Sequence, residues 1–522
     1  MAKRIFAFVI VIFVMFWCAE SAPGIHVVEM EICTDPNAQR NPDIEDNFIV
    51  WQDNRNGDWD IYAYDLKRHA EYAICTADGN QTNPSVGFGN ILYEPIIAWQ
   101  DDRNGNNDIY GYKLIDPYYD LAIGTEIEIC TDPCDQQNPV SMGNYVCWQD
   151  CRNGNWDIYG KSYENAMEPN EFVICDDSSD QINPAADWYY VAWQDNRGGD
   201  WDIYGFDLDD QNEVAVCTED GNQTNPSCSG PIGFAWQDDR NGGEDIYGLL
   251  CTDIICSGYA EVGVCTAPGT QINTSLSIEA VVWQDDRNGT WDIYGYKIDN
   301  IYFGQEFIVS AGAGDQVRPA TYVYDSVVWQ DSRNGNDDIY AAYLCLRGND
   351  NCGECAIELF DGQPYFGSTQ DMSVTHIDTP TGYEWLTSTC GFNDFVDTWH
   401  IYQPAVGGPV TITTEGSSID TILAVFNSCY SQHPDYQPPI ELACNDDYCL
   451  ENAGSKVTLD AVKGKTYYVR VSGFNNQTGE YRIVVKRGAA TDPIKSDLNG
   501  NGKVDLFDFS IFASEWLMSD TE

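Results

Sequence analysis

Six oxygen donors near the C-terminus have the most specific chemical spacing in this chain. A twelve-residue calcium loop supplies ligands from positions 1, 3, 5, 7, 9 and 12, and it needs glycine at position 6, where the backbone turns sharply. Here position 6 is Gly502, and the ligand positions are occupied in order by Asp497, Asn499, Asn501, Lys503 through its backbone carbonyl, Asp505 and Asp508. A polar Asn/Gly turn before a helix would explain the glycine and the asparagines, but not the carboxylates at positions 1, 9 and 12. The spacing therefore predicts a calcium site, with calcium as the cofactor.

A short helix is expected to follow this loop and hold it in place. The apolar positions Phe507, Ile511, Phe512 and Leu517 recur at helical spacing. The segment 497–517 resembles one half of a type I dockerin repeat, which implies a cohesin-like partner for the tail. Dockerins that engage cohesins carry two such repeats, and only one is visible here.

A phrase of about sixteen residues occurs seven times in the first two thirds of the chain. Each copy reads Trp-Gln-Asp, then a glycine turn that carries an arginine, then Asp-Ile-Tyr. The copies begin at Trp51, Trp99, Trp148, Trp193, Trp236, Trp283 and Trp329. Their spacing of 43 to 49 residues is the length of a four-stranded propeller blade, and the glycine turn fits a hairpin between two strands. A Gln-x-Asn-Pro phrase, as at residues 81–84, opens the next unit, and because proline would interrupt a central ladder we expect it at a strand start.

The two ends of the repeat array predict how a ring of blades would close. Residues 27–34 form a strand with no unit before it, whereas the seventh unit stops near residue 346 without its last strand. Pairing these pieces gives seven complete blades and no open edge. The units resemble the TolB-like, WD40-like propeller repeats over residues 26–346, which implies the fold but little about the ligand.

The residues that recur in every copy could form structure or a site. Trp51 and its counterparts are expected to fill the core between blades. Asp53, Arg55 and Asp60 recur together, and a guanidinium between two carboxylates would brace the hairpin. The functional alternative is a ring of carboxylates on one face of the disc that collects cations or basic segments.

The second domain is expected to be a β-sandwich. Residues 347–355 are polar and Gly-rich and predict a linker, whereas residues 356–488 contain short alternating strands. This segment resembles the bacterial pre-peptidase C-terminal domain through its 397–399, 418–425, 444–447 and 464–471 motifs, which implies a jelly-roll-like accessory module without catalytic activity. Cys429 and Cys444 are a plausible disulfide pair, and Asp420, Asp446 and Asp447 are interpreted as turn carboxylates with cation binding as the alternative.

The N-terminus indicates export, and the net charge argues against one class of partner. The 522 residues carry a formal net charge of −57, which argues against a nucleic-acid partner. Lys3 and Arg4 precede an apolar run over residues 5–17, followed by small residues, as in a secretory signal peptide over residues 1–21. No later stretch is long enough for a transmembrane segment. Twenty cysteines fit an oxidising compartment, and 19 of them follow the signal peptide, so at least one mature thiol is free or intermolecular.

Together these features predict an all-β, secreted protein that is not an enzyme. The domains are a signal peptide (1–21), a seven-bladed β-propeller (26–346), a linker (347–355), a β-sandwich (356–488) and a calcium module (489–522). No nucleophile elbow, zinc-protease helix or phosphate loop occurs in the sequence. We expect a monomer that presents a propeller face to an extracellular protein or polysaccharide. The alternative is a secreted hydrolase with a site in the propeller channel, since two suitable carboxylates would suffice.

Overall fold

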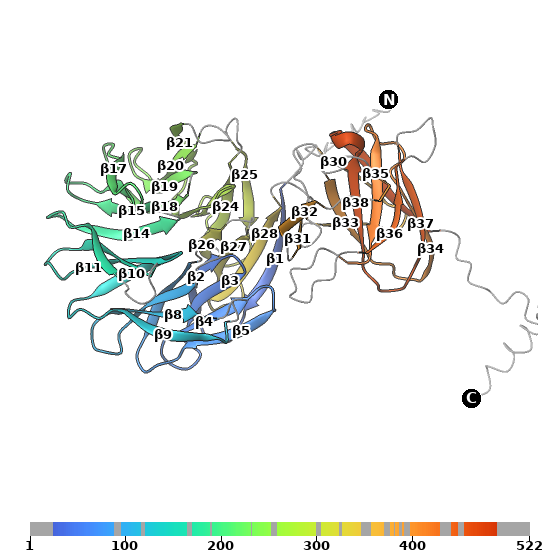
Figure 1. Cartoon of the computed structure of the whole chain (residues 1–522). Coiled ribbons are helices and arrows are strands. Elements are labelled where there is room, and N and C mark those ends of the chain that lie inside the picture. Colours follow the sequence, from blue (N-terminus) through green and yellow to red (C-terminus); the bar gives the residue numbers. More distant parts are fainter. Residues whose placement is uncertain are drawn as a thin grey trace, which may run out of the picture.

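The computed structural model shows an all-β chain (Figure 1). It describes residues 25–87, 95–115, 121–163, 170–187, 190–230, 232–251, 258–298, 304–322, 326–345, 356–369, 376–379, 382–385, 389–390, 397–428, 440–446 and 454–487. The predicted signal peptide, linker and calcium module lie outside these residues.

Seven four-stranded antiparallel sheets form the blades of the propeller, and within the first six the strands follow sequence order. Blades 1 and 2 are β2 (Gln39–Glu45), β3 (Phe48–Asp53), β4 (Asp60–Asp65), β5 (Ala70–Cys75) and β6 (Gln81–Gly87), β7 (Ile96–Asp101), β8 (Asp108–Leu114), β9 (Gly124–Cys130). Blades 3 and 4 are β10 (Gln136–Met142), β11 (Tyr145–Asp150), β12 (Asp157–Ser162), β13 (Asn170–Cys175) and β14 (Gln181–Asp187), β15 (Tyr190–Asp195), β16 (Asp202–Asp207), β17 (Asn212–Cys217). Blades 5 and 6 are β18 (Gln223–Ser229), β19 (Gly233–Asp238), β20 (Asp245–Cys251), β21 (Tyr259–Cys265) and β22 (Gln271–Leu276), β23 (Ala280–Asp285), β24 (Asp292–Lys297), β25 (Glu306–Ser310).

The seventh blade joins the two ends of the array, as predicted. It consists of β26 (Gln316–Tyr322), β27 (Ser326–Asp331), β28 (Asp338–Cys345) and the N-terminal strand β1 (His26–Cys33). β1 pairs antiparallel with β28, from His26 opposite Cys345 to Cys33 opposite Ile339. The first strand of the described chain therefore completes the last blade (Figure 1).

The expected position of the Gln-x-Asn-Pro proline is wrong. Pro42 lies inside β2, where the register against β3 shifts between Arg40 and Asp43. This shift is a β-bulge, and Asn41 adopts a left-handed conformation there with φ 50°. Asparagine tolerates this conformation better than most residues, and a bulge leaves a residue outside the ladder where proline can be placed.

The repeated tryptophans fill the contacts between neighbouring blades, as predicted. All seven are completely buried. Trp99 of blade 2, for example, packs in one cluster with Val50 and Ile61 of blade 1. A tryptophan buries about 200 Å², which at about 25 cal/mol per Å² contributes up to about 5 kcal/mol per blade contact.

Two further sheets enclose a separate core, in agreement with the predicted sandwich. One has the order β29-β33-β38-β35-β36 and the other β30-β39-β34-β37. Their strands are β29 (Ile357–Glu358), β30 (Pro364–Ser368), β33 (Asp397–Tyr402), β34 (Gly408–Thr413), β35 (Thr421–Phe426), β36 (Glu441–Asn445), β37 (Lys456–Ala461), β38 (Tyr467–Gly473) and β39 (Glu480–Arg487), with the hairpin β31 (His376–Thr379) and β32 (Gly382–Trp385) and the 3-10 turn η1 (Phe474–Asn476).

A buried ion pair lies at the centre of the first of these sheets. The Arg470 guanidinium bonds to Asp397 at 2.6 Å, and both side chains are completely buried. The same carboxylate accepts a hydrogen bond from the Trp399 indole at 3.1 Å. These residues belong to the motifs at 397–399 and 464–471, so in this structure the buried parts of these motifs help to form the interior of the sandwich.

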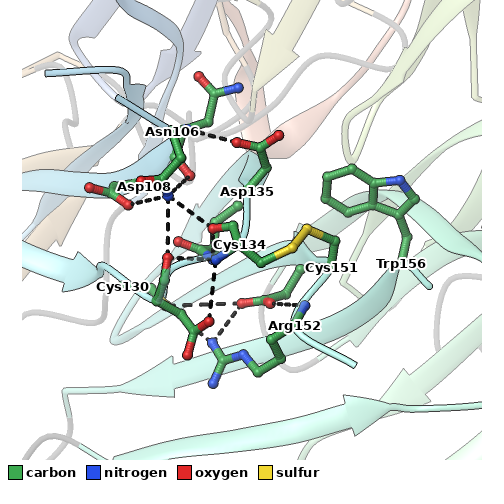
Figure 2. The surroundings of a disulfide bond; sticks show 12 residues. Asn106, Asp108, Cys130, Cys134, Asp135, Cys151, Arg152 and Trp156 are labelled. Atoms are coloured by element: carbon green, nitrogen blue, oxygen red, sulfur yellow. Dashed lines mark hydrogen bonds and ion pairs between the residues drawn. A yellow bond between two sulfur atoms is a disulfide. The ribbon is translucent and has the colours of Figure 1, made fainter. Parts of the chain in front are cut away.

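The disulfides correct the expected pairing. Cys444 bonds to Cys390 and not to Cys429. In the propeller, Cys134 and Cys151 join the loop after β9 to the hairpin of blade 3 (Figure 2). Eight described cysteines are free and buried, in line with the expectation of unpaired thiols.

Candidate functional site

The six predicted calcium ligands, Asp497, Asn499, Asn501, Lys503, Asp505 and Asp508, lie outside the described residues. Within the described part of the chain, no three His, Cys, Asp or Glu side chains gather as a metal-binding group. The candidate sites are therefore the repeated hairpins and the channel that the blades surround.

The hairpin arginine binds two carboxylates, but the second one differs from the prediction. Arg103 bonds to Asp101 at 2.6 Å and to Glu126 on β9 at 2.8 Å. Asp108, the expected second partner, instead accepts a bond from Asn104 at 2.8 Å. The same correction holds for Arg55, which binds Asp53 and Glu71 while Asp60 bonds to Asn56.

The same hairpin network recurs in every blade. The first carboxylate, completely buried, also accepts the indole N–H of the repeated tryptophan, as from Trp99 to Asp101 at 2.9 Å. The guanidinium lies over the ring of the repeated tyrosine, 4.3 Å from the centroid for Arg103 over Tyr110. Because the guanidinium, the buried carboxylate and the indole bind one another, these residues stabilise the blade, and the structural interpretation of the repeat holds for them.

A contact between blades was not anticipated from the sequence. The second guanidinium nitrogen of the hairpin arginine donates to a cysteine sulfur at the end of the preceding blade, as from Arg152 to Cys130 at 3.1 Å (Figure 2). Six such contacts measure 3.0 to 3.2 Å, and they involve Cys33, Cys75, Cys130, Cys175, Cys217 and Cys265. At the seventh junction Ser310 accepts the bond from Arg333 at 3.1 Å. The signal available in the sequence was the cysteine that ends the outermost strand in six of the seven blades.

These thiols are held in their protonated form. Burial raises the pKa of Cys33, Cys75, Cys175 and Cys265 to about 12. The neighbouring guanidinium opposes the shift without cancelling it. A thiol with such a pKa is a poor nucleophile, so the cysteines act as hydrogen-bond acceptors.

The innermost strand of each blade lines a channel with a volume of about 700 Å³. In six of the seven blades an asparagine lies at the bulge of this strand and lines the wall, with φ between 46° and 54°. The Nδ2 of Asn138, for example, donates to Gln149 at 3.0 Å and to Asn183 of the next blade at 2.9 Å. Such amide bonds run from Asn41 through Asn83, Asn138 and Asn183 to Asn225.

Blade 7 replaces the ring asparagine with Arg318. The residue keeps the left-handed backbone, with φ 54°, although arginine tolerates it less well than asparagine. Its side chain lines the channel and is exposed there, and no ion pair to it exists among the described residues. Partial desolvation lowers the pKa of Arg318, and Arg40 acts in the same direction. Arg318 is thus an unpaired cation in the wall of a polar channel.

Two aspartates also line the channel. Asp43 accepts backbone bonds from Val86 and Ile44, both at 2.9 Å, and desolvation raises its pKa. Asp187 accepts a bond from the backbone of Gly230 at 2.9 Å. Both carboxylates therefore hold neighbouring chain segments, and burial raises the pKa of Asp43 above its ordinary value.

Comparisons with known proteins find remote structural likenesses. No family model and no curated protein matches this chain. Among solved structures, it is similar to a putative TolB from Agrobacterium tumefaciens (12% identity, 54% of this chain and 96% of that chain, TM-score 0.33). It is also similar to an oligogalacturonate lyase from Vibrio parahaemolyticus (12%, 61% and 96%, TM-score 0.42) and to the β-propeller domain of the Trilobed protease from Pyrococcus furiosus (10%, 59% and 97%, TM-score 0.42). At identities of 10–12% and TM-scores of 0.33 to 0.42, these likenesses say nothing about the ligand or the activity of this chain.

The described part of the chain contains no helix with the length and apolar character needed to cross a membrane.

Proposed function

We propose that this chain is a secreted, monomeric, non-catalytic binding protein whose propeller channel receives an anionic group of an extracellular polysaccharide or protein. Arg318 is the observation that carries the proposal. It occupies a backbone position that six blades give to asparagine, and it places an unpaired guanidinium in the channel. A guanidinium presents a planar set of donors that fits carboxylate, sulfate and phosphate groups.

The other modules fit this role as accessories. The 356–488 segment serves as a non-catalytic module of the pre-peptidase C-terminal type. The tail at 489–522 binds calcium through Asp497, Asn499, Asn501, Lys503, Asp505 and Asp508 and attaches or sorts the protein. Titration of calcium into the full chain and into its Asp497→Ala and Asp508→Ala variants tests the tail.

Arg318→Asn gives a matched test of the channel because it restores the residue of the other six blades. We expect the variant to fold and to lose binding to acidic glycans or acidic peptides on an array, while any binding to neutral ligands is unchanged. Lys113→Asn, which removes an outer cation of blade 2 away from the channel, serves as the charge control. Equal binding by wild type and Arg318→Asn would refute this use of the channel.

A hydrolase with its site in the channel is the second candidate, and the raised pKa of Asp43 favours it. Under this alternative, the protein would turn over a polysaccharide or peptide, and Asp43→Asn would abolish that turnover. Binding without turnover supports the first proposal.

A further inference from the structure

The channel wall repeats one hydrogen-bond unit in six of the seven blades. The Nδ2 of the ring asparagine donates to the glutamine of the Trp-Gln-Asp phrase in its own blade, as from Asn138 to Gln149 at 3.0 Å. That glutamine oxygen also accepts the backbone N–H of the ring residue in the next blade, as from Asn183 at 2.9 Å. The six asparagine–glutamine bonds measure 2.6 to 3.0 Å, and they start from Asn41, Asn83, Asn138, Asn183, Asn225 and Asn273.

Blade 7 breaks this unit, because Arg318 does not take over the bond of the asparagine. Gln330 is the glutamine of that blade, and its side-chain oxygen is buried and has no hydrogen-bond partner among the described residues. The corresponding oxygen is bonded in each of the other six blades. The guanidinium thus leaves an acceptor of its own blade unused, so it does not belong to the hydrogen-bond network of the wall.

The amide bonds that link neighbouring blades end before Arg318. They run from Asn41 to Asn225, along blades 1 to 5. Within the described part of the chain, the Nδ2 of Asn225 donates only to Gln237, and that of Asn273 only to Gln284. Between blades 6 and 7 such a link cannot form, because a guanidinium carries N–H donors and no acceptor. One N–H of the Asn273 amide is therefore left without an acceptor in the wall.

Arg318 and Asn273 are held next to each other on the strands β26 and β22. The backbone N–H of Arg318 donates to the side-chain oxygen of Gln284 at 2.9 Å, and the Asn273 Nδ2 donates to the same oxygen at 2.7 Å. Both residues line the channel, and both have φ 54°. A cation and an amide donor thus adjoin in the channel wall, and the wall supplies an acceptor neither for the guanidinium nor for the second amide N–H.

Charge limits the kind of anion that this place can bind. The chain has a formal net charge of −57, and Arg318 is the one cation among the described residues that line the channel. Long-range repulsion from such a chain disfavours a ligand with many negative charges. A ligand with a single oxyanion group matches the single guanidinium.

The rest of the wall favours a sugar as the carrier of this group. Besides the asparagine amides, serine hydroxyls line the channel in blades 2, 3, 5 and 6, at Ser85, Ser141, Ser227 and Ser275. Amides and hydroxyls both donate and accept hydrogen bonds, as the hydroxyl groups of a sugar do. Such a wall is complementary to an uncharged, hydroxyl-rich ligand.

We propose that Arg318 and the Asn273 amide together bind the carboxylate or sulfate of an acidic sugar in an otherwise uncharged glycan. This inference rests on the proposed function, and it adds a second binding residue and a narrower ligand class. The guanidinium supplies the charge and the forked donors, while the amide donates its remaining N–H to an oxygen of the same group. Polyanionic chains and neutral glycans are poor ligands of this site.

Binding of four probes to the full-length chain, followed by ligand-observed NMR titration, tests the site. The probes are methyl glucuronide, its neutral counterpart methyl glucoside, an oligouronate of three sugars, and N-acetyl-triglycine as a peptide carboxylate. Wild type is compared with Arg318→Asn and Asn273→Asp. Aspartate tolerates the left-handed backbone but replaces the remaining N–H with a charged acceptor beside Arg318.

Asn138→Asp is the matched control, because it places the same charge in the wall of blade 3, three blades from both blade 6 and blade 7. It also breaks the amide bonds to Gln149 and Asn183. We therefore expect it to lower the unfolding temperature by more than Asn273→Asp, so a loss of stability would not explain a loss of binding.

We expect wild type to bind methyl glucuronide saturably, the oligouronate no more tightly, and methyl glucoside not at all. Arg318→Asn and Asn273→Asp should each weaken the binding of methyl glucuronide by about tenfold or more. Asn138→Asp should change it by less than about twofold, because salt screens charges that far apart.

The outcomes separate this inference from the proposed function. Loss of binding with Arg318→Asn but not with Asn273→Asp would overturn the role of Asn273 and leave the proposed function standing. Tighter binding of the oligouronate or of N-acetyl-triglycine than of methyl glucuronide would overturn the ligand class. Unchanged binding by Arg318→Asn, or no binding of any carboxylate probe by wild type, would overturn both.

Discussion

Replacing Arg103 with alanine tests whether the hairpin network holds the blades together. Asp101 is completely buried and would lose two guanidinium bonds, at 2.8 and 2.6 Å. It would keep the Trp99 indole bond at 2.9 Å and one backbone bond at 3.0 Å. Breaking a buried ion pair costs about 3–5 kcal/mol. The two remaining donors and the partial exposure of Arg103 place the expected loss at about 2–3 kcal/mol.

Glu126 provides the comparison because it is the exposed partner of the same arginine. Its side chain is 40% exposed, so Glu126→Gln should cost less than about 1 kcal/mol. Arg103→Lys keeps the charge but not the forked donors, so its loss of stability should lie between those of Arg103→Ala and Glu126→Gln. Urea unfolding followed by tryptophan fluorescence gives these differences in the free energy of unfolding, provided that its slope against urea concentration is the same in all variants. An Arg103→Ala variant as stable as wild type, or a larger loss for Glu126→Gln, would refute this account of the network.

Three further predictions concern the junctions between blades. Cys75→Ser should change the free energy of unfolding by less than about 1 kcal/mol, because Ser310 already accepts the arginine bond at one junction. Cys75→Val should lower the free energy of unfolding by more, because it removes the acceptor, and equal losses for the two variants in urea unfolding would contradict this. The buried thiols have folded-state pKa values raised from 9.0 to about 11 or 12, so their contribution to the free energy of unfolding is complete below pH 9 and is lost as pH rises towards 12. An unfolding temperature that stays constant over this alkaline range would contradict the raised pKa values. Deleting residues 27–34 removes the partner of β28 and should cause aggregation or loss of cooperative unfolding, measured by light scattering and calorimetry, and a soluble variant of equal stability would show that closure does not depend on β1.

The sequence predicted the blades because their pattern repeats, and the closure because two incomplete ends complement each other. The second carboxylate of the hairpin network was not predictable from the phrase itself. Glu126 lies 23 residues after Arg103, on an outer strand whose distance from the hairpin varies between blades. The nearer Asp108 matched the spacing but is held by Asn104.

One departure from the repeat marks a residue of the channel wall. The seventh Gln-x-Asn-Pro phrase reads Gln316-Val317-Arg318-Pro319, and this exchange marks the unpaired cation of the channel. Its meaning depends on which strands line the channel, and that requires the packed ring.

The most direct test of the proposed function follows one acidic ligand, selected on the array, by calorimetry and mass spectrometry. We predict a saturable one-site binding heat with wild type, no measurable binding with Arg318→Asn, and recovery of the ligand with its mass unchanged. Unchanged binding by Arg318→Asn, or new product masses that disappear with Asp43→Asn, would contradict the account of the channel as a binding site without catalysis.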